Sequence, residues 1–392
     1  MFLGDGFHAS IGDNIMIKSI IVQGLNGHLN LNVDVNHDLN IVTGCNGAGK
    51  TTLLKLLWYM MSSNRELILS EVQFSYVMLK TDTYEFSIEN DSSGNKNGMP
   101  SHARFRYKEY DTMYSIDKRI LHDHGMTSEE DTEALRELNR RADTREDETI
   151  FFPTFRRIEG GFALERRRRM SYGHSVARSL NDAVEEYSSA MSSRRHKFVA
   201  SISTSDIEEL LMRKYADVSE KTNSLYLDFS RFIMAQMEQE SENETITAIK
   251  IRDSIRNRLS IVNENRAKLM RPFDVLTELM QSVFRDKGVK VSQNIAFGLA
   301  KKAIAARILS AGEKQMFGFL SYNAFADNTT IFIDEPELSL HVDWQRILFR
   351  MLMSQGSTNQ FIIATHSPFI YSQYPQKELF LNVDRGYNNT GI

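Results

Sequence analysis

A glycine-rich run between an apolar strand-like stretch and an apolar helix-like stretch constrains the fold more than any other feature. Residues 44–51 read GCNGAGKT and fit the pattern G-x-x-x-x-G-K-[ST]. Glycines let backbone N–H groups converge on phosphate oxygens, and a following helix presents unpaired N–H groups and its positive dipole end to the anion. The run therefore predicts a strand over 39–43, a phosphate-binding loop, and a helix from Gly49 to about Met61.

We expect this loop, called the P-loop below, to bind a nucleoside triphosphate. The candidate nucleotide-binding residues are Gly44, Asn46, Gly47, Ala48, Gly49, Lys50, Thr51 and Thr52. Lys50 would reach the β- and γ-phosphates, and Thr51 would place its hydroxyl on Mg²⁺. The alternative is a glycine-rich turn between strand and helix that holds no ligand.

Acidic and imidazole side chains follow two apolar stretches near the other end of the chain. The strand-like residues 331–333 end in Asp334 and Glu335, and residues 361–364 are followed by Thr365 and His366. In a parallel sheet, carboxylates at the end of a strand lie beside the loop of a neighbouring strand. We predict that Asp334 holds Mg²⁺, that Glu335 polarises the attacking water and that His366 senses the γ-phosphate. The alternatives are an ordinary acidic turn and a capped histidine turn.

The segment LSAGEKQ, residues 309–315, opens a predicted helix about 20 residues before the two carboxylates. It resembles the signature L-S-G-G-Q of ABC-type ATPases, with Ala311 and Glu313 as departures. The resemblance implies that Ser310, the Gly312 backbone and Glu313 contact a nucleotide bound by the other subunit of a dimer. Ser339 falls where that family's D-loop crosses the dimer interface. P-loop, signature, carboxylates, D-loop and histidine occur in the family's order.

The resemblance implies an α/β fold: an ABC-type P-loop head, with a mixed sheet and helices, interrupted by a mostly helical insert. It also implies ATP and Mg²⁺ as cofactors and ATP hydrolysis as the activity. Gln73 is a candidate for the family's magnesium-coupling glutamine; the alternative is an ordinary strand residue. The segment 151–162, FFPTFRRIEGGF, is a candidate junction that would bring Arg156 and Arg157 near the nucleotide or a partner.

Residue composition and hydrophobic patterning change along the chain and divide it into three parts. Residues 1–119 and 286–392 hold short strand-like stretches and are predicted to form the two halves of the head. Residues 120–285 are charged and helical, and are predicted to form an insert that carries oligomer or partner contacts. Within the insert, Ser205 and Glu208 are spaced as a capping box, and Pro272 is expected to interrupt a helix.

The opening pattern, 17–57, resembles the RecF/SMC/Rad50-like branch, and DEPELSLH with Trp344 and Gln345 resembles the ATPases of overcoming-lysogenization-defect (OLD) type. That group includes ATPase subunits of bacterial anti-phage systems such as Septu (PtuA) and PARIS (AriA). The resemblance covers roughly residues 15 to 60 and 305 to 385. The sequence has no long heptad tract, and too little chain follows His366 for a TOPRIM domain. The resemblance thus implies the sensor or scaffold subunit of a two-component anti-phage defence complex that controls a separate effector nuclease, of TOPRIM or HNH type. The subunit would form a homodimer or higher even oligomer, triggered by DNA or a phage protein. The alternatives are a RecF/SMC-like DNA repair or recombination ATPase and a non-hydrolysing, nucleotide-bound scaffold.

Composition and charge restrict the classes of binding partner and the cellular compartment that we expect for this chain. The formal net charge is −4, which predicts no general affinity for nucleic acid, although Arg166–Arg169 form a basic run that could track a phosphate backbone. The alternative for this run is a solvated helix face paired with acidic neighbours. Cys45 is the only cysteine, which excludes a disulfide within the chain. We find no signal peptide and no apolar stretch long enough to span a membrane, so we expect a cytoplasmic protein with no membrane partner.

Overall fold

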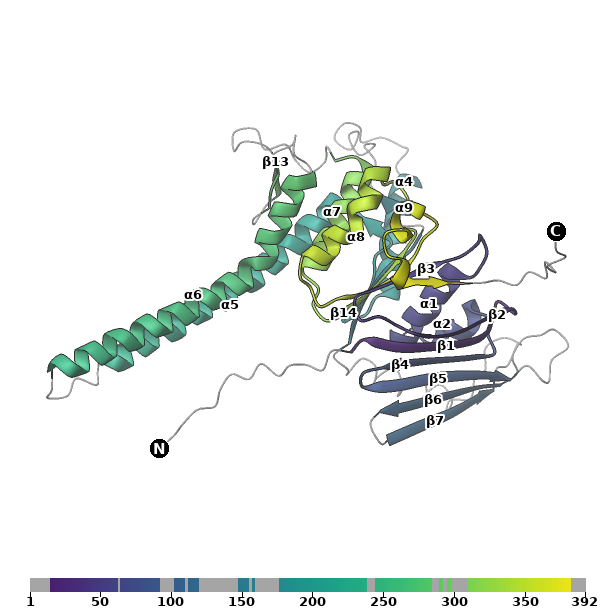
Figure 1. The fold of residues 1–392 in the computed structure, drawn as a ribbon, viewed down its shortest axis with the longest axis horizontal. Helices are drawn as coiled ribbons and strands as arrows, with labels where there is room; N and C mark the ends of the chain where they lie inside the picture. Colours follow the sequence, from purple (N-terminus) through teal and green to yellow (C-terminus); the bar gives the residue numbers. More distant parts are fainter. Residues whose placement is uncertain are drawn as a thin grey trace.

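The computed structural model of the 392-residue chain contains a two-sheet head and a long helical hairpin (Figure 1). It describes residues 15–62, 64–91, 102–109, 112–119, 147–154, 157–158, 176–237, 244–283, 289–291, 295–297 and 309–381. The α/β class with a helical insert, predicted from the sequence, is confirmed. The basic run Arg166–Arg169 and Arg156 lie outside the described residues.

The first sheet has six antiparallel strands built from the N-terminal part of the chain. Its strand order is β2 (Leu29–Asp34), β1 (Ile17–Leu25), β4 (Tyr76–Thr81), β5 (Tyr84–Asp91), β6 (His102–Glu109) and β7 (Thr112–Arg119). Inward and outward side chains alternate along these strands; in β4, for example, Val77 and Leu79 are buried and Lys80 is exposed. This alternation gives the sheet one apolar face, which covers the helix after the P-loop.

The second sheet has six parallel strands that come from distant parts of the chain. Its strand order is β10 (His196–Phe198), β8 (Glu148–Phe152), β14 (Thr329–Asp334), β15 (Gln360–Ala364), β3 (Leu39–Thr43) and β16 (Glu378–Phe380). Every residue of β3, β14 and β15 is buried. Continuous apolar runs of this kind are typical of parallel strands that are covered on both faces.

Alternate residues of the parallel strands enter two different cores. In β14, Phe332 enters the core shared with α1 (Lys50–Met61) and the first sheet. Ile331 and Ile333 enter the core on the other face, with α7 (Ala311–Ala324) and α8 (Val342–Ser354). The helix that follows the P-loop is therefore held between the two sheets.

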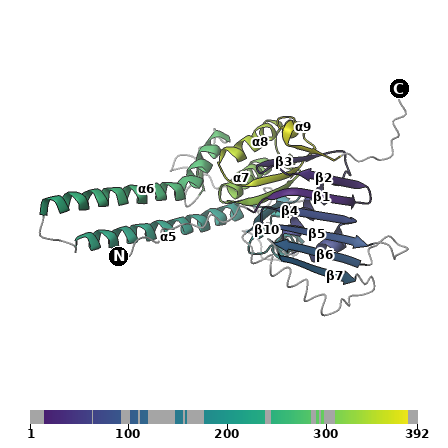
Figure 2. The same ribbon diagram turned by 60° about the horizontal axis from the view of Figure 1, so that its bottom comes forward.

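Two long helices, α5 (Thr204–Met237) and α6 (Glu244–Val283), lie side by side and project away from the head (Figures 1 and 2). We call this pair the hairpin. At a rise of about 1.5 Å per residue, each helix spans roughly 50–60 Å. None of the described helices, long as these two are, is apolar enough to cross a membrane.

Two local expectations for the hairpin are wrong. The capping box at the start of α5 pairs Ser203 with Asp206, each accepting a hydrogen bond from the other's backbone N–H, and not Ser205 with Glu208. Pro272 lies inside α6 and does not end it. Proline removes one helical hydrogen bond, which bends a helix that packing holds on both sides. Figure 1 shows the last part of α6 turning away from the hairpin axis.

The head also includes residues from within the range 120–285. Strand β8 pairs with β14, and β10 pairs with β8, so both belong to the parallel sheet. The first turns of α5 also enter the head, because Ile207 and Leu211 are buried in the core that holds α7 and α8. The helical part that projects from the head is thus shorter than the sequence boundaries at 120 and 285 imply.

The remaining described elements are short or lie at the edges of the head. They are α2 (Glu66–Glu71), β9 (Arg157–Ile158) with its parallel partner β11 (Ser201–Ile202), α4 (Val176–Met191), the β12 (Val289–Val291) and β13 (Ile295–Phe297) pair, α9 (Pro368–Tyr371) and a 3₁₀ turn, η3 (Pro375–Lys377).

One buried side chain ties the two sheets together. The Gln360 amide donates to the carbonyls of Ile17 at 2.9 Å and Asn36 at 2.8 Å, and its oxygen accepts from the Ile17 N–H at 3.0 Å. Gln360 itself is fully buried at the start of β15. Buried backbone groups that lose their only side-chain partner are costly.

We predict that Gln360→Ala lowers the free energy of unfolding by about 2–4 kcal/mol, because it leaves the Ile17 backbone groups unpaired in the core. Equilibrium urea denaturation measures the change. Gln373→Ala is the matched control: Gln373 is exposed, and its amide donates to the nearby Phe369 carbonyl in α9. An equal effect of both substitutions would contradict this role of Gln360.

Candidate nucleotide-binding site

Four neighbouring strands, in the order β8, β14, β15 and β3, end at one edge of the parallel sheet. The P-loop follows β3, His366 follows β15, Asp334 ends β14, and Thr154 comes two residues after β8. Parallel strands bring their carboxyl ends to the same side, which explains why residues from four chain segments meet there. The strand β15 separates the carboxylates from the P-loop strand, so the histidine turn lies between them.

The P-loop adopts backbone conformations that suit glycine. Gly44 and Gly49 have φ of 146° and 93°. A Cβ on Gly44 would lie 2.8 Å from the Leu381 carbonyl oxygen, so the close approach of this segment after β16 also requires glycine. Leu381 donates its N–H to the Thr43 carbonyl at 2.9 Å, which fixes the start of the loop.

Lys50 is buried at the first position of α1. Its ammonium donates to the carbonyl oxygens of Gly44 at 3.1 Å and Cys45 at 3.2 Å, and so lies across the loop. Burial lowers the Lys50 pKa, and the nearby carboxylates of Glu335 and Asp334 act in the opposite direction. The ammonium thus lies between the P-loop backbone and the acidic end of β14.

The Asp334 carboxylate joins two hydroxyl groups. Thr51 Oγ1 donates to Asp334 Oδ1 at 3.1 Å, and the Thr154 hydroxyl donates to the other carboxylate oxygen. Asp334 is only 1% exposed. The sequence predicted Thr51 and Asp334 but not Thr154, whose only signal was its place in the candidate junction 151–162.

Glu335 directly follows β14 in a left-handed conformation, with φ of 48°. Its N–H donates to the Ala364 carbonyl at 2.8 Å, which holds this uncommon geometry in place. Burial raises the Glu335 pKa, and the negative charges of Asp334 and Glu337 raise it further, against the opposing effects of His366 and Lys50. A carboxylate with a raised pKa beside a phosphate-binding loop is suited to accept a proton.

Glu337 holds the histidine turn and was not predicted from the sequence. Its carboxylate accepts the His366 N–H at 2.7 Å and the Thr365 hydroxyl at 2.9 Å. The His366 side chain remains exposed. The segment after β14 therefore positions the segment after β15. The only sequence signal for Glu337 was its place at the end of the acidic segment DEPE, residues 334–337.

The signature segment begins α7 with a capping box. Ser310 Oγ accepts the Glu313 N–H at 3.3 Å, and the Glu313 carboxylate accepts the Ser310 N–H at 2.7 Å. Ser310 is exposed, while Gly312 is buried against the D-loop segment. A Cβ on Gly312 would lie 2.3 Å from the Ser339 carbonyl oxygen, so only glycine permits this approach. The predicted signature and D-loop residues are in contact within one protomer.

The candidate metal residue Gln73 forms no hydrogen bond with Asp334 in the part of the chain that the structure describes. Its side chain is exposed, and its carbonyl accepts the Asn26 N–H at 2.9 Å. The Asn26 amide in turn donates to Thr52 Oγ1 at 3.5 Å. The structure therefore connects Gln73 to the helix after the P-loop through Asn26.

Three solved structures resemble the chain at low sequence identity. They are an Smc head bound to the C-terminal winged-helix domain of ScpA (12% identity, TM-score 0.38), an Smc head with an extended coiled coil bound to the C-terminal domain of ScpA, derived from Pyrococcus furiosus (11%, 0.37), and the SMC head domain from Thermotoga maritima (10%, 0.37). Each likeness covers 91% of both chains. No curated protein matches the chain.

The sequence also matches a protein-family model over residues 39–372. The family is described as "AAA domain, putative AbiEii toxin, Type IV TA system". The matched range begins at β3 and includes the P-loop, the signature segment, both carboxylates and the histidine turn.

We predict that Glu337→Gln destabilises the protein by about 1–2 kcal/mol, because the amide keeps one oxygen acceptor in place of two and the bond from the His366 N–H is no longer made to a charged group. The midpoint of urea denaturation measures the change. Glu278→Gln, an exposed change on α6, is the control and should shift the midpoint little. Equal midpoints for both variants would show that Glu337 does not hold the turn.

Proposed function

The chain belongs to this AAA-domain family of P-loop ATPases, and from that premise we propose that it binds and slowly hydrolyses ATP between two head-to-tail copies of itself. The observation that carries the proposal is the hydrogen bond between Thr51 and Asp334. It joins the first turn of the P-loop helix to the carboxylate strand, 283 residues away in sequence. A triphosphate on the loop therefore lies next to the acidic residues that hydrolysis requires.

The same pair of side chains fits Mg²⁺. A threonine hydroxyl and a carboxylate are hard oxygen ligands, and Mg²⁺ in nucleotide sites takes one or two such ligands together with phosphate oxygens. When bound, Mg²⁺ would neutralise charge on the β- and γ-phosphates. Thr154, on the other Asp334 oxygen, keeps the carboxylate oriented toward Thr51.

The remaining residues have distinct roles in hydrolysis. The Lys50 ammonium leaves the Gly44 and Cys45 carbonyls to contact the β- and γ-phosphates. Glu335 takes a proton from the water that attacks the γ-phosphorus, and the bond to ADP breaks. His366, held by Glu337 through its backbone, presents its ring to the γ-phosphate.

The dimer arrangement is supported by the exposed N-terminus of α7. Ser310 and Ala311 are exposed, so the first residues of that helix do not face the core of their own protomer. A helix N-terminus attracts an anion. The partner's γ-phosphate would supply that anion, with Gly312 and Ser339 fixing the segment at the interface.

The finer biological role is the sensor or scaffold subunit of a two-component anti-phage defence complex. The family description names a toxin–antitoxin system, which supports a setting with a second component. The hairpin offers a surface for it: Leu227, Met234, Met237 and Ile249 are each about half exposed or more, an unfavourable state for apolar side chains without a partner. ATP binding would hold the dimer and restrain a separate effector nuclease until DNA or a phage protein triggers its release.

We predict that Glu335→Gln lowers the rate of ATP hydrolysis by at least about 100-fold while ATP still binds, because it removes the proton acceptor alone. Phosphate release measures the rate, and light scattering after gel filtration measures a dimer stabilised by ATP. Glu220→Gln, exposed on α5, is the control. A wild-type protein that binds ATP, hydrolyses none and is unchanged by Glu335→Gln would support the non-hydrolysing scaffold.

We further predict that two inactive variants restore activity when mixed. Lys50→Ala damages the P-loop and Ser310→Arg damages the signature, so each homodimer lacks both composite sites. A mixed dimer retains one site, built from the intact loop of one protomer and the intact signature of the other. An equal mixture should regain roughly a quarter of the wild-type sites. No recovery, in a mixture shown to exchange subunits, would contradict the head-to-tail arrangement.

A further inference from the structure

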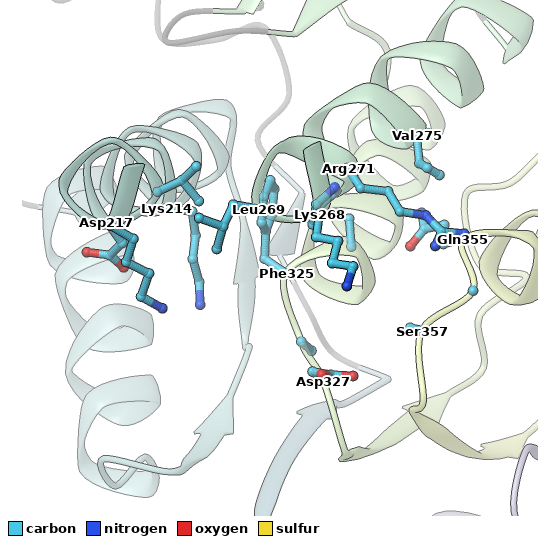
Figure 3. Close-up of a pocket in the computed structure, with 16 residues that line it drawn as sticks. Lys214, Asp217, Lys268, Leu269, Arg271, Val275, Phe325, Asp327, Gln355 and Ser357 are labelled. Carbon is cyan, nitrogen blue, oxygen red and sulfur yellow. The ribbon is translucent and has the colours of Figure 1, made fainter. Parts of the chain in front are cut away.

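A basic cleft lies at the root of the hairpin, away from the nucleotide site. It has a volume of about 310 Å³ and is bounded by α5, α6 and the segments that precede β14 and β15 (Figure 3). Those segments enter the parallel sheet at its amino edge, whereas the P-loop and Asp334 lie at the carboxyl edge. The cleft is therefore distinct from the candidate nucleotide-binding site.

Four cationic side chains line the cleft: Lys214 and Lys221 from α5, and Lys268 and Arg271 from α6. Figure 3 shows Lys214 and Lys268 extending into the same space, opposite Asp327. Asp327 already accepts a hydrogen bond from the Thr358 hydroxyl. Among the described residues, no hydrogen bond or ion pair involves any of the four cations. Asp217 also lines the cleft, so its four cations and two carboxylates leave a formal net charge of +2 there.

These cations are not needed to cap the helices that end at the cleft. Helices α7 and α8 both point their C-terminal carbonyls toward this edge, and cations often stabilise such ends. Here, however, three buried side-chain amides donate hydrogen bonds to these C-terminal carbonyls. Gln355 donates to the Leu320 carbonyl at 3.1 Å, Asn323 to the Leu352 carbonyl at 2.9 Å, and Asn359 to the Asn323 carbonyl at 3.3 Å.

A second, smaller hollow continues the basic surface along α5. Lys214 lines both hollows, and Lys197 and Arg195 line the second. Burial lowers the Lys197 pKa, the positive charges of Lys214 and Arg213 lower it further, and Glu148 only partly opposes them. Like charges held together cost folding free energy, and a bound anion would relieve that cost.

The other walls of the cleft are apolar. Val218, Leu269, Val275 and Phe325 line it beside the cations. Small-ligand sites commonly combine apolar walls with a few convergent polar groups, in volumes from about 300 Å³ upward. A groove for a nucleic-acid strand would instead be an extended basic track.

From this geometry we infer that the cleft binds a small phosphorylated compound, with phosphate groups on Lys214 and Lys268 and an apolar or ring portion against Leu269 and Phe325. The class includes nucleoside monophosphates and similar phosphate esters. Arg271, which extends toward Gln355 in Figure 3, supplies a further donor at the rim. This assignment is independent of ATP hydrolysis at the other edge of the sheet.

An occupied cleft would contact the signature helix. Ser310 caps the N-terminus of α7 at the proposed dimer interface, and Phe325 caps its C-terminus at the cleft wall. One rigid helix thus connects the two places. A ligand in the cleft could therefore alter the contact between the N-terminus of α7 and the nucleotide bound by the partner, so the cleft would be a regulatory site.

The test uses full-length Lys50→Ala protein, so that the P-loop does not contribute. Isothermal titration calorimetry is run with pyrophosphate, AMP, GMP and UMP, and with a 20-nucleotide single strand and a 20-base-pair duplex. We expect at least one nucleoside monophosphate to bind, more weakly at high salt. Adding Lys214→Ala and Lys268→Ala together should weaken that binding by about tenfold or more.

Lys250→Ala is the matched control, because Lys250 is exposed on α6 and does not line the cleft. It should leave binding unchanged, and circular dichroism confirms that each variant is folded. Three results would overturn the proposal: no binding by any small phosphate compound, binding that the Lys214/Lys268 pair does not affect, or binding by the oligonucleotides alone, which would assign the cleft to a nucleic-acid backbone.

Discussion

The buried Asp334 carboxylate joins three distant segments of the chain at the candidate site. One of its oxygens accepts from Thr51 in the first turn of α1, and the other from Thr154 after β8. These partners are 283 and 180 residues away along the chain, so the contacts exist only when the parallel sheet has assembled in its correct strand order. A buried carboxylate without these donors would be costly, which makes the fold and the site depend on one another.

The sequence predicted the parts of this arrangement that rest on local chemistry. The P-loop strand has the predicted bounds, 39–43, and α1 begins at Lys50, one residue after the predicted start, because glycine content and apolar patterning decide both. The sequence singled out Asp334 and His366 because each follows a short run of apolar residues, 331–333 and 361–364. The start of α7 was also predicted, since residues 309–315 were expected to open a helix, and Ser310 caps it.

Other parts depend on pairing between distant segments and gave no local signal. Strand β8 reads as one apolar stretch within a charged, helical region, and only its pairing with β14 makes it part of the sheet. Thr154 and Glu337 act through partners that sequence order does not reveal. The start of α5 shows a different limit: the sequence favoured Ser205 as the cap, whereas Ser203 caps the helix and Ile207, four residues later, is buried in the head core. Pro272 is tolerated within α6 because Phe273 and Leu276 anchor the helix in the head core.

The direction of the helices explains why the two edges of the parallel sheet carry different chemistry. Helix α1 begins at the carboxyl edge, where backbone N–H groups and the positive dipole end receive phosphate with few side chains. Helices α7 and α8 end at the amino edge, where backbone carbonyls face outward and repel an anion. Any anion site at that edge must first cap those carbonyls and then supply side-chain cations. The amides of Asn323 and Gln355 meet the first requirement, and the lysines at the root of the hairpin meet the second.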